Sequence, residues 1–231
     1  MSAEQKPEIA SVWTRPRRQR EQLSREQIVA EAVRLLDADG LEALSMRKLG
    51  TRLDAGATSL YRHVANKDEL IELVVDEVYG ELSVPAATGP AEWRDAAAGS
   101  ARSLRTMILS HPWVASVLGQ VGLVHLGPNV TKMSERMAAV YRTAGFPEAE
   151  TELALSTVIS YVIGMATSEA AYLSLIARSG VTEREFAERL RGEGGSGSRT
   201  DDPEQVREET FDYGLQRVLD GLQARLASTA P

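Results

Sequence analysis

The strongest constraint on the fold of this 231-residue chain is a pair of short predicted helices joined by a tight turn. Ser45 can cap the first of them, which places Leu49 and Leu53 on one face. The turn spans 54–56 and contains a glycine, and the second short helix is predicted over 57–64. Two short helices joined in this way are typical of a helix-turn-helix, in which the second helix enters the major groove of DNA.

Longer helices are predicted on both sides of this pair. The helix over 25–38 begins with a capping box and ends before Gly40, where a left-handed residue belongs. A second capping box, Asn66 with Glu69, begins another helix whose apolar residues fall on one face. The flanking helices therefore supply the support that a helix-turn-helix needs.

The rest of the chain also has helical periodicity, with no strand pattern and no repeat. Two prolines and a glycine break the pattern at 83–92, and a glycine- and serine-rich loop is expected at 192–202. The fold class predicted from the sequence is therefore all-α. Helices are predicted over 91–110, 112–120, 129–144, 148–178, 182–191 and 203–227.

Composition favours a cytoplasmic protein. The chain has no cysteine, which excludes a disulfide scaffold and fits a reducing compartment. Its first residues lack the apolar run of a signal peptide, and no run of 18 uncharged apolar residues follows. The net charge is −7, yet residues 1–70 hold 12 Lys and Arg against 11 Asp and Glu. The acidic chain thus has a comparatively basic N-terminal part.

Residue types in and around the second short helix suit contact with DNA. Small and hydroxylated residues at its start allow close approach to base edges, and the cations and the tyrosine that follow can reach phosphates. Helix N-termini also favour phosphate. The candidate DNA-binding residues here are Ser45, Arg47, Lys48, Ala57, Thr58, Ser59, Tyr61, Arg62, His63 and Lys67. The alternative interpretation of the same residues is the solvated basic face of an ordinary helical hairpin.

Two motifs in this part of the chain resemble a known family. "GLEALSMRKLG" and "SLYRHVANKDEL" are similar to the DNA-binding domain of the tetracycline-repressor (TetR) family of bacterial transcriptional regulators, over about 55 ungapped residues. The resemblance implies a DNA-binding regulator, released from its operator by a small apolar or amphipathic ligand. No enzymatic activity is expected, because the sequence has no H-E-x-x-H or G-x-S-x-G motif and its three histidines lie on different segments. Positions that match operator or phosphate contacts of the family are Arg47, Thr58, Ser59, Tyr61, His63 and Lys67.

The segment before the first helix is basic and cannot continue that helix, because Pro16 interrupts it. Arg17 and Arg18 lie in "RPRRQR", and such arms elsewhere read the minor groove of DNA. A solubilising tail is the alternative. The division expected is an arm over 1–22, a helix-turn-helix domain over 23–82, and a helical ligand-binding and dimerisation domain over 91–231.

"SHPW" and "LVHLGPN" resemble the C-terminal domain of the tetracycline repressors, where a histidine matching His125 helps to bind a drug–magnesium chelate. This chain departs from that pattern at Pro128 and Ser168, so we expect no metal site and no cofactor. His125 is either a pocket residue or a plain hydrogen-bonding residue. Expected pocket residues, each with core packing as its alternative role, are Leu104, Met107, Ile108, Val117, His125, Met133, Met137, Tyr161 and Met165.

Apolar stripes recur on the helices over 148–178 and 203–227. Part of each stripe must be core, but the resemblance implies that these two helices also pair with a second copy in a homodimer. Gly192, Gly194 and Gly197 formally match a dinucleotide fingerprint, yet they follow a helix rather than a strand, which argues against that role. The remaining alternative is a ligand-binding or scaffold protein of the same fold that does not act through DNA.

Overall fold

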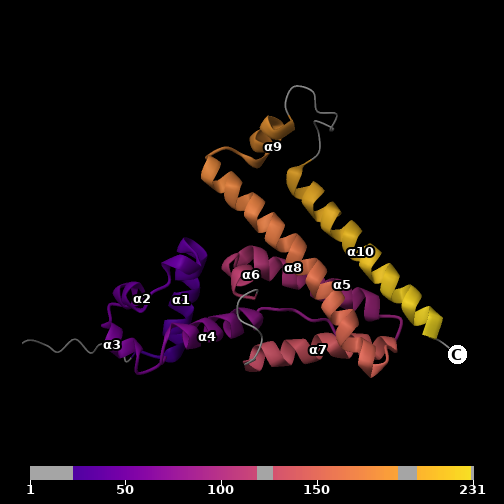
Figure 1. The fold of residues 1–231 in the computed structure, drawn as a ribbon, viewed down its shortest axis with the longest axis horizontal. Coiled ribbons are helices and arrows are strands. Elements are labelled where there is room, and N and C mark those ends of the chain that lie inside the picture. The colour runs from indigo at the N-terminus through magenta and orange to yellow at the C-terminus, as the bar shows by residue number, and fades with distance from the viewer. Residues whose placement is uncertain (1–22, 119–126, 192–201, 230–231) are drawn as a thin grey trace, which may run out of the picture.

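The computed structural model describes residues 23–118, 127–191 and 202–229, and the regular elements in these ranges are all helices (Figure 1). The N-terminal helices are α1 (Arg25–Asp39), the 3-10 turn η1 (Leu41–Ala43), α2 (Met46–Arg52), α3 (Ala57–Leu60) and α4 (Lys67–Tyr79). They are followed by α5 (Trp93–Ser110), α6 (Trp113–Leu118), α7 (Pro128–Ala144), α8 (Glu148–Ser179), α9 (Glu183–Arg191) and α10 (Pro203–Thr229).

Side-chain caps begin the N-terminal helices where the sequence predicts them. Ser24 Oγ accepts a hydrogen bond from the Gln27 amide at 3.2 Å, and the Gln27 side chain accepts one from the Ser24 amide at 3.0 Å. Ser45 Oγ caps α2 by accepting from the Lys48 amide at 3.2 Å. At α4, Asn66 accepts from the Glu69 amide at 2.8 Å as expected, but the Glu69 side chain accepts from the Ala65 amide and not from Asn66, so only half of the predicted capping box forms. These caps satisfy backbone donors that the first helical turns leave free.

The helix α3 is shorter than predicted. It ends at Leu60, and residues 61–63 continue as turns rather than as the helix expected to residue 64. The amide of His63 donates to the Leu60 carbonyl at 2.9 Å, one residue closer than in an α-helix. The prediction failed because the tightened last turn still buries Leu60 and Val64, so the apolar spacing is the same in both geometries.

The positive backbone angles also differ from expectation. In the 54–56 turn Asp54 has φ 47°, whereas Gly56 has an ordinary φ of −70°. Aspartate tolerates this region better than most residues. Gly40 has φ 77° but ψ 176°, so it ends α1 with a positive φ outside the left-handed helical region. The glycine that the motif requires is Gly50, where a Cβ would lie 2.7 Å from the Ala55 carbonyl oxygen.

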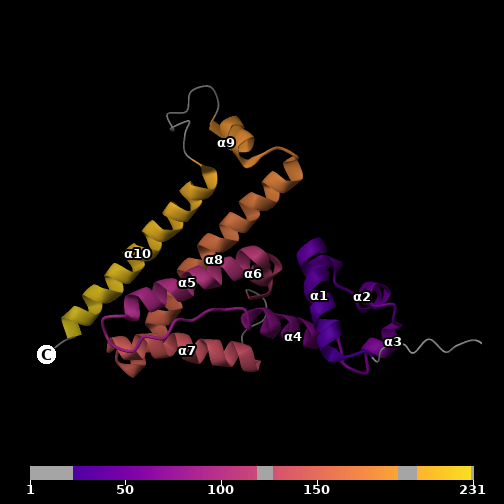
Figure 2. The ribbon, with the colours of Figure 1, turned by 180° about the vertical axis from the view of Figure 1, so that it is seen from behind.

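The C-terminal helices form one packed body (Figure 1), with α5 against α7 and α8, and α10 along α8. Alanines on α5 allow close approach, since Ala97 and Ala101 are both buried against neighbouring helices. Figure 2 shows α8 and α10 as two long helices whose far ends extend beyond α5 and α7 toward α9.

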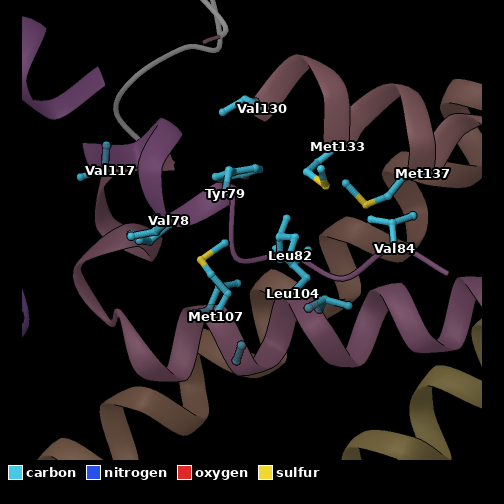
Figure 3. Packing of buried hydrophobic residues seen from close by; sticks show 14 of the residues in the cluster. Val78, Tyr79, Leu82, Val84, Leu104, Met107, Val117, Val130, Met133 and Met137 are labelled. Atoms are coloured by element: carbon cyan, nitrogen blue, oxygen red, sulfur yellow. The ribbon is translucent and has the colours of Figure 1, made fainter. Parts of the chain in front are cut away.

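The apolar core continues without a gap from the N-terminal helices into the C-terminal body. Val78 and Tyr79 at the end of α4, with Leu82 after it, lie among side chains of α5 and α7 (Figure 3). The helix-free segment expected at 83–92 is present, but Val84 within it is buried. Packed side chains, as well as the chain itself, therefore join the C-terminal helices to the N-terminal helices α1–α4, the reading head.

The stripe on α8 that faces inward is core. Val158, Val162 and Ala166 are buried, in agreement with the core alternative for that stripe. The opposite face of α8 is exposed. Helix α8 has the length and composition of a membrane-crossing helix, with a mean hydropathy of 1.3 over its most apolar window, but one such helix is weak support for a span. Only 28% of that window is buried, so much of an apolar helix faces outward.

Candidate functional site

The face of the helix-turn-helix that carries α3 presents most of the candidate DNA-binding residues to solvent. Thr58, Tyr61, Arg62, Arg47 and Lys67 are exposed, and Tyr61 retains 51% of its accessible surface. An exposed aromatic ring of this size, directly after the four-residue helix α3, contributes little to the core, so it is available to a partner. The half-buried members of the predicted set are Ala57, Ser59 and His63.

The cations of this face differ in how their charge is compensated. Lys48 pairs with Asp39 at 2.9 Å, and Arg52 pairs with Glu31. Within the described ranges, no carboxylate lies within ion-pair distance of Arg47, Arg62 or Lys67. Uncompensated cations around an exposed helix favour binding of a polyanion, because each can release counterions from it.

Arg25 of α1 holds the turn that follows α3 in place. Its Nε donates to the carbonyl oxygen of His63 at 3.2 Å, which fixes the turn after α3 against α1. Leu60, fully buried, anchors the helix itself. No local sequence pattern indicates this role of Arg25, because its partner is 38 residues away and is a backbone atom.

A small cavity lies between α5, α7 and α8. Its volume is about 10 Å³, room for about one water molecule. Ser100 and Tyr141 bring hydroxyl groups to the lining, and the Ser100 hydroxyl donates to the Ala96 carbonyl oxygen at 2.8 Å. Burial raises the pKa of Tyr141, so its hydroxyl remains protonated. The lining residues are Ala97, Ser100, Ala101, Leu104, Met137, Val140, Tyr141, Leu155, Val158, Ile159 and Val162.

The predicted pocket residues lie in three different places. Leu104 and Met137 line the cavity. Met107, Val117 and Met133 (Figure 3), together with Ile108, are buried in the apolar core and do not line the cavity. Tyr161 instead contacts α10, since its hydroxyl donates to the Phe211 carbonyl oxygen at 2.8 Å, and Met165 is only partly buried. His125, Arg17 and Arg18 lie outside the described residues.

Glu169, one position from Ser168, is the acidic residue nearest in sequence to the metal position of the family. Both of its oxygens accept hydrogen bonds from Arg105, at 2.7 and 2.8 Å, and one also accepts from Arg207 at 3.0 Å. Arg105 also lies over the Phe211 ring. The carboxylate is thus committed to an ion-pair network that joins α5, α8 and α10.

Two aspartates that the sequence patterns did not single out hold the N-terminal helices to the C-terminal body. Asp37 binds His111 and Trp113, while Asp76 accepts from the amides of Asn129 and Val130 in the first turn of α7, at 2.9 and 3.0 Å. Both aspartates lie near the C-terminal end of a helix, where the helix dipole disfavours an anion. That unfavourable placement was the available signal that each has a partner elsewhere.

An exposed recognition helix with uncompensated cations, joined through a shared core to a helical body with an internal cavity, defines a helix-turn-helix regulator of transcription. Family models agree with this class. The model for bacterial regulatory proteins of the tetR family matches residues 28–74, and the model for the tetracyclin repressor-like C-terminal domain matches residues 84–226. The chain belongs to the TetR family, and it is a DNA-binding transcriptional regulator of that family.

Relatives with similar sequences carry the same description. An HTH-type transcriptional regulator of Saccharopolyspora erythraea is 42% identical over 70% of this chain and 69% of its own length. The HTH-type transcriptional repressor DrrR1 of Streptomyces coeruleorubidus is 33% identical over 89% of this chain and 79% of its own. These relatives are named as regulators of transcription and not as enzymes.

Solved structures of similar proteins include one complex with a small molecule and one with DNA. ActR of Streptomyces coelicolor in complex with actinorhodin is 32% identical, has a TM-score of 0.72 and covers 90% of this chain and 99% of its own. BioQ with its double-stranded DNA operator is 28% identical, has a TM-score of 0.61 and covers 87% and 98%.

Proposed function

We propose that this chain is a homodimeric repressor that binds a two-fold operator through α3 and leaves it when a small apolar or amphipathic molecule opens the cavity between α5, α7 and α8. The observation that carries the DNA-binding part is the set of exposed residues on α3 beside cations without carboxylate partners. BioQ, which has a similar fold, is known with its operator, and this supports the same mode here. Repression would take place in the cytoplasm, where the DNA is.

The division of roles among the candidate residues follows from their positions. Thr58 and Ser59 begin α3, the end of a recognition helix that meets base edges. Arg47, Arg62 and Lys67 lie around it and are suited to phosphates, and Lys67 occupies the first turn of α4. We assign base reading to the first group and backbone binding to the second.

The exposed face of α8 is the surface proposed for dimerisation. A row of small residues runs along it, and Gly164 has no atom within 4 Å of the place that a Cβ would occupy. Small residues let two helices approach closely. Leu153 and Leu175 near its ends are 66% and 50% exposed, and Tyr213 on α10 is 67% exposed. Two reading heads joined in this way would meet successive major grooves, about 34–36 Å apart.

The cavity is proposed as the ligand site. A cavity of about 10 Å³ is too small for a drug-sized molecule, so the described arrangement corresponds to a ligand-free state. The ligand must therefore favour a wider arrangement, in which Met137 and Leu104 move apart. Its apolar part would replace contacts of these side chains, and a polar group would meet the Tyr141 hydroxyl. ActR, of similar fold, is known in complex with actinorhodin, which makes that compound a rational first probe.

Two measurements test the proposal. First, the protein is used to select duplexes from a random pool, and recovery of a two-fold symmetric sequence bound more tightly than random DNA is expected. Second, actinorhodin should raise the melting temperature of the protein by mass action and lower its affinity for the selected duplex. Failure to select any duplex would favour a ligand-binding protein that does not act through DNA. Stabilisation by the probe without release of DNA would remove the inducer role of the cavity alone.

A further inference from the structure

His111 lies at the corner between α5 and α6, where the two halves of the chain meet. Its ring is buried, with 7% of the residue exposed. Nδ1 lies 2.7 Å from a carboxylate oxygen of Asp37, in the last turns of α1, and Nε2 lies 3.1 Å from a carboxylate oxygen of Glu81, just after α4. A carboxylate only accepts, so both contacts are hydrogen bonds only when both ring nitrogens donate, that is, when the ring is an imidazolium.

The same carboxylate of Asp37 receives a second donor. Trp113 Nε1 donates to it at 2.8 Å from the first residue of α6, and the amide of Val114 donates to the His111 carbonyl oxygen at 2.9 Å. The ring and backbone of His111 therefore fix the α5–α6 corner to α1 and α4 together. Asp37 and Glu81 supply the negative charges that act on the ring.

This corner is continuous with the wall of the cavity. Met107, whose carbonyl accepts the His111 amide, lies one turn before it on α5, and Leu104 of the cavity lies one turn earlier still. We propose that His111 is a positioning residue, an inference that rests on the proposed repressor function. Its protonated ring holds α1 and α4 in the ligand-free arrangement that binds the operator, so operator affinity depends on its charge.

The direction of the pH dependence follows from the surroundings of the ring. Burial alone would lower the pKa of His111, but the hydrogen bonds and negative charges of Asp37 and Glu81 outweigh it and raise the pKa above 6.5. Because the pKa is raised, the hydrogen bonds of His111 with Asp37 and Glu81 contribute their full stability below pH 6.5. That contribution is lost as the pH rises through the pKa of the folded protein.

The test compares operator affinity across pH 5.5 to 9 for four proteins. These are the wild type, His111→Gln, Glu81→Gln and the control Glu77→Gln, which makes the same chemical change on the exposed face of α4. The probe is a duplex that the wild type itself selects from a random pool. Folded fraction is measured at each pH by circular dichroism, and affinities are referred to folded protein.

We expect His111→Gln to bind the duplex about tenfold more weakly than the wild type at pH 6, a typical coupling between sites. Its operator affinity should also vary less with pH than that of the wild type, because the variant lacks the ring of His111. Glu81→Gln keeps the hydrogen bond between His111 and Asp37 and alters a half-exposed side chain, so the variant should fold. Its operator affinity should lie between those of the wild type and His111→Gln. Glu77→Gln should match the wild type. His63 on the reading head is unchanged in all four proteins, so differences among their profiles do not arise from it.

Two results would overturn the inference. One is a His111→Gln protein that melts earlier but has the affinity and pH profile of the wild type once corrected for folding, since His111 would then be structural only. If His111→Gln does not fold, a Glu81→Gln profile identical to that of the wild type likewise makes His111 structural only. A wild type that selects no duplex would instead contradict the proposed function itself.

Discussion

Gly50 of α2 lies so close to Ala55 that a Cβ on Gly50 would be 2.7 Å from the Ala55 carbonyl oxygen. The Ala55 amide donates back to the Gly50 carbonyl at 2.9 Å, so two backbone segments touch across the turn of the helix-turn-helix. This contact, rather than a glycine within the turn, sets the spacing between α2 and α3. Asp54 supplies the positive φ that the turn needs.

Gly50→Ala should therefore destabilise the protein and weaken DNA binding, because the Ala55 backbone must shift to admit a methyl group. Overpacking of this kind costs about 1–3 kcal/mol. Gly56→Ala is the matched control, since a Cβ at Gly56 meets nothing within 4 Å and its φ is ordinary. Urea unfolding measures both. Equal stability of the two variants would mean that the turn adjusts freely to the added methyl group.

Substitutions on the reading face should separate specificity from general affinity. Thr58→Ala should reduce the preference for the selected duplex over random DNA, because its side chain is assigned to base edges. Lys67→Ala should weaken both duplexes alike and lower the slope of log affinity against log salt by about one. Lys132→Ala, which removes another exposed cation on α7, controls for net charge. Parallel losses for Thr58→Ala and Lys67→Ala on both duplexes would contradict the assignment.

The helices were predictable from sequence because their signals are local. Ser24, Ser45 and Asn66 each lie within three residues of the amide they cap, so a short window contains the whole interaction. The contacts between the two halves have no such window, since His111 and Asp37 are 74 residues apart. Periodicity also does not say which face of α8 meets its neighbours, and only the packing reveals that its small-residue face is the exposed one.

Asp76→Ala should loosen the joint between α4 and α7. The substitution leaves the amides of Asn129 and Val130 without their acceptor, which for a helix N-terminus costs about 0.5–2 kcal/mol. Asp76→Asn keeps an acceptor and should cost less. Glu72→Ala, on the exposed side of α4, should be close to neutral. Hydrogen exchange at the start of α7 is the direct readout, and unchanged protection in Asp76→Ala would show that the carboxylate does not hold that helix.

Glu169→Gln should destabilise the C-terminal body by about 1–3 kcal/mol, because two arginines lose a charged acceptor. Burial raises the pKa of Glu169, but hydrogen bonds and charges of Arg105 and Arg207 outweigh it and lower the pKa below 4.5. The stabilisation is therefore complete above 4.5 and is lost as the pH falls through the lowered pKa. Unfolding curves at several pH values test this, with the exposed Glu152→Gln as control. A difference in the free energy of unfolding between Glu169→Gln and the wild type that stays constant down to pH 3 would refute this.

Gly164→Leu should separate dimerisation from folding. The space around Gly164 is open in the single chain, so the monomer has room for the larger side chain, and leucine also favours a helix more than glycine does. If the exposed face of α8 packs against a second copy, the added side chain holds the two helices apart. We therefore expect sedimentation to give a monomer for Gly164→Leu and a dimer for the wild type. Ala139→Leu, at an exposed position of α7, should remain a dimer.

Loss of the dimer should affect DNA binding in a defined way. A single reading head keeps its contacts with one half-site but loses the second head, whose high effective concentration the dimer provides. Gly164→Leu should therefore bind an isolated half-site as the wild type does and bind the full two-fold duplex far more weakly. A variant that stays dimeric, or one that becomes monomeric while keeping full affinity for the two-fold duplex, would place the dimer surface elsewhere or make it unnecessary for repression.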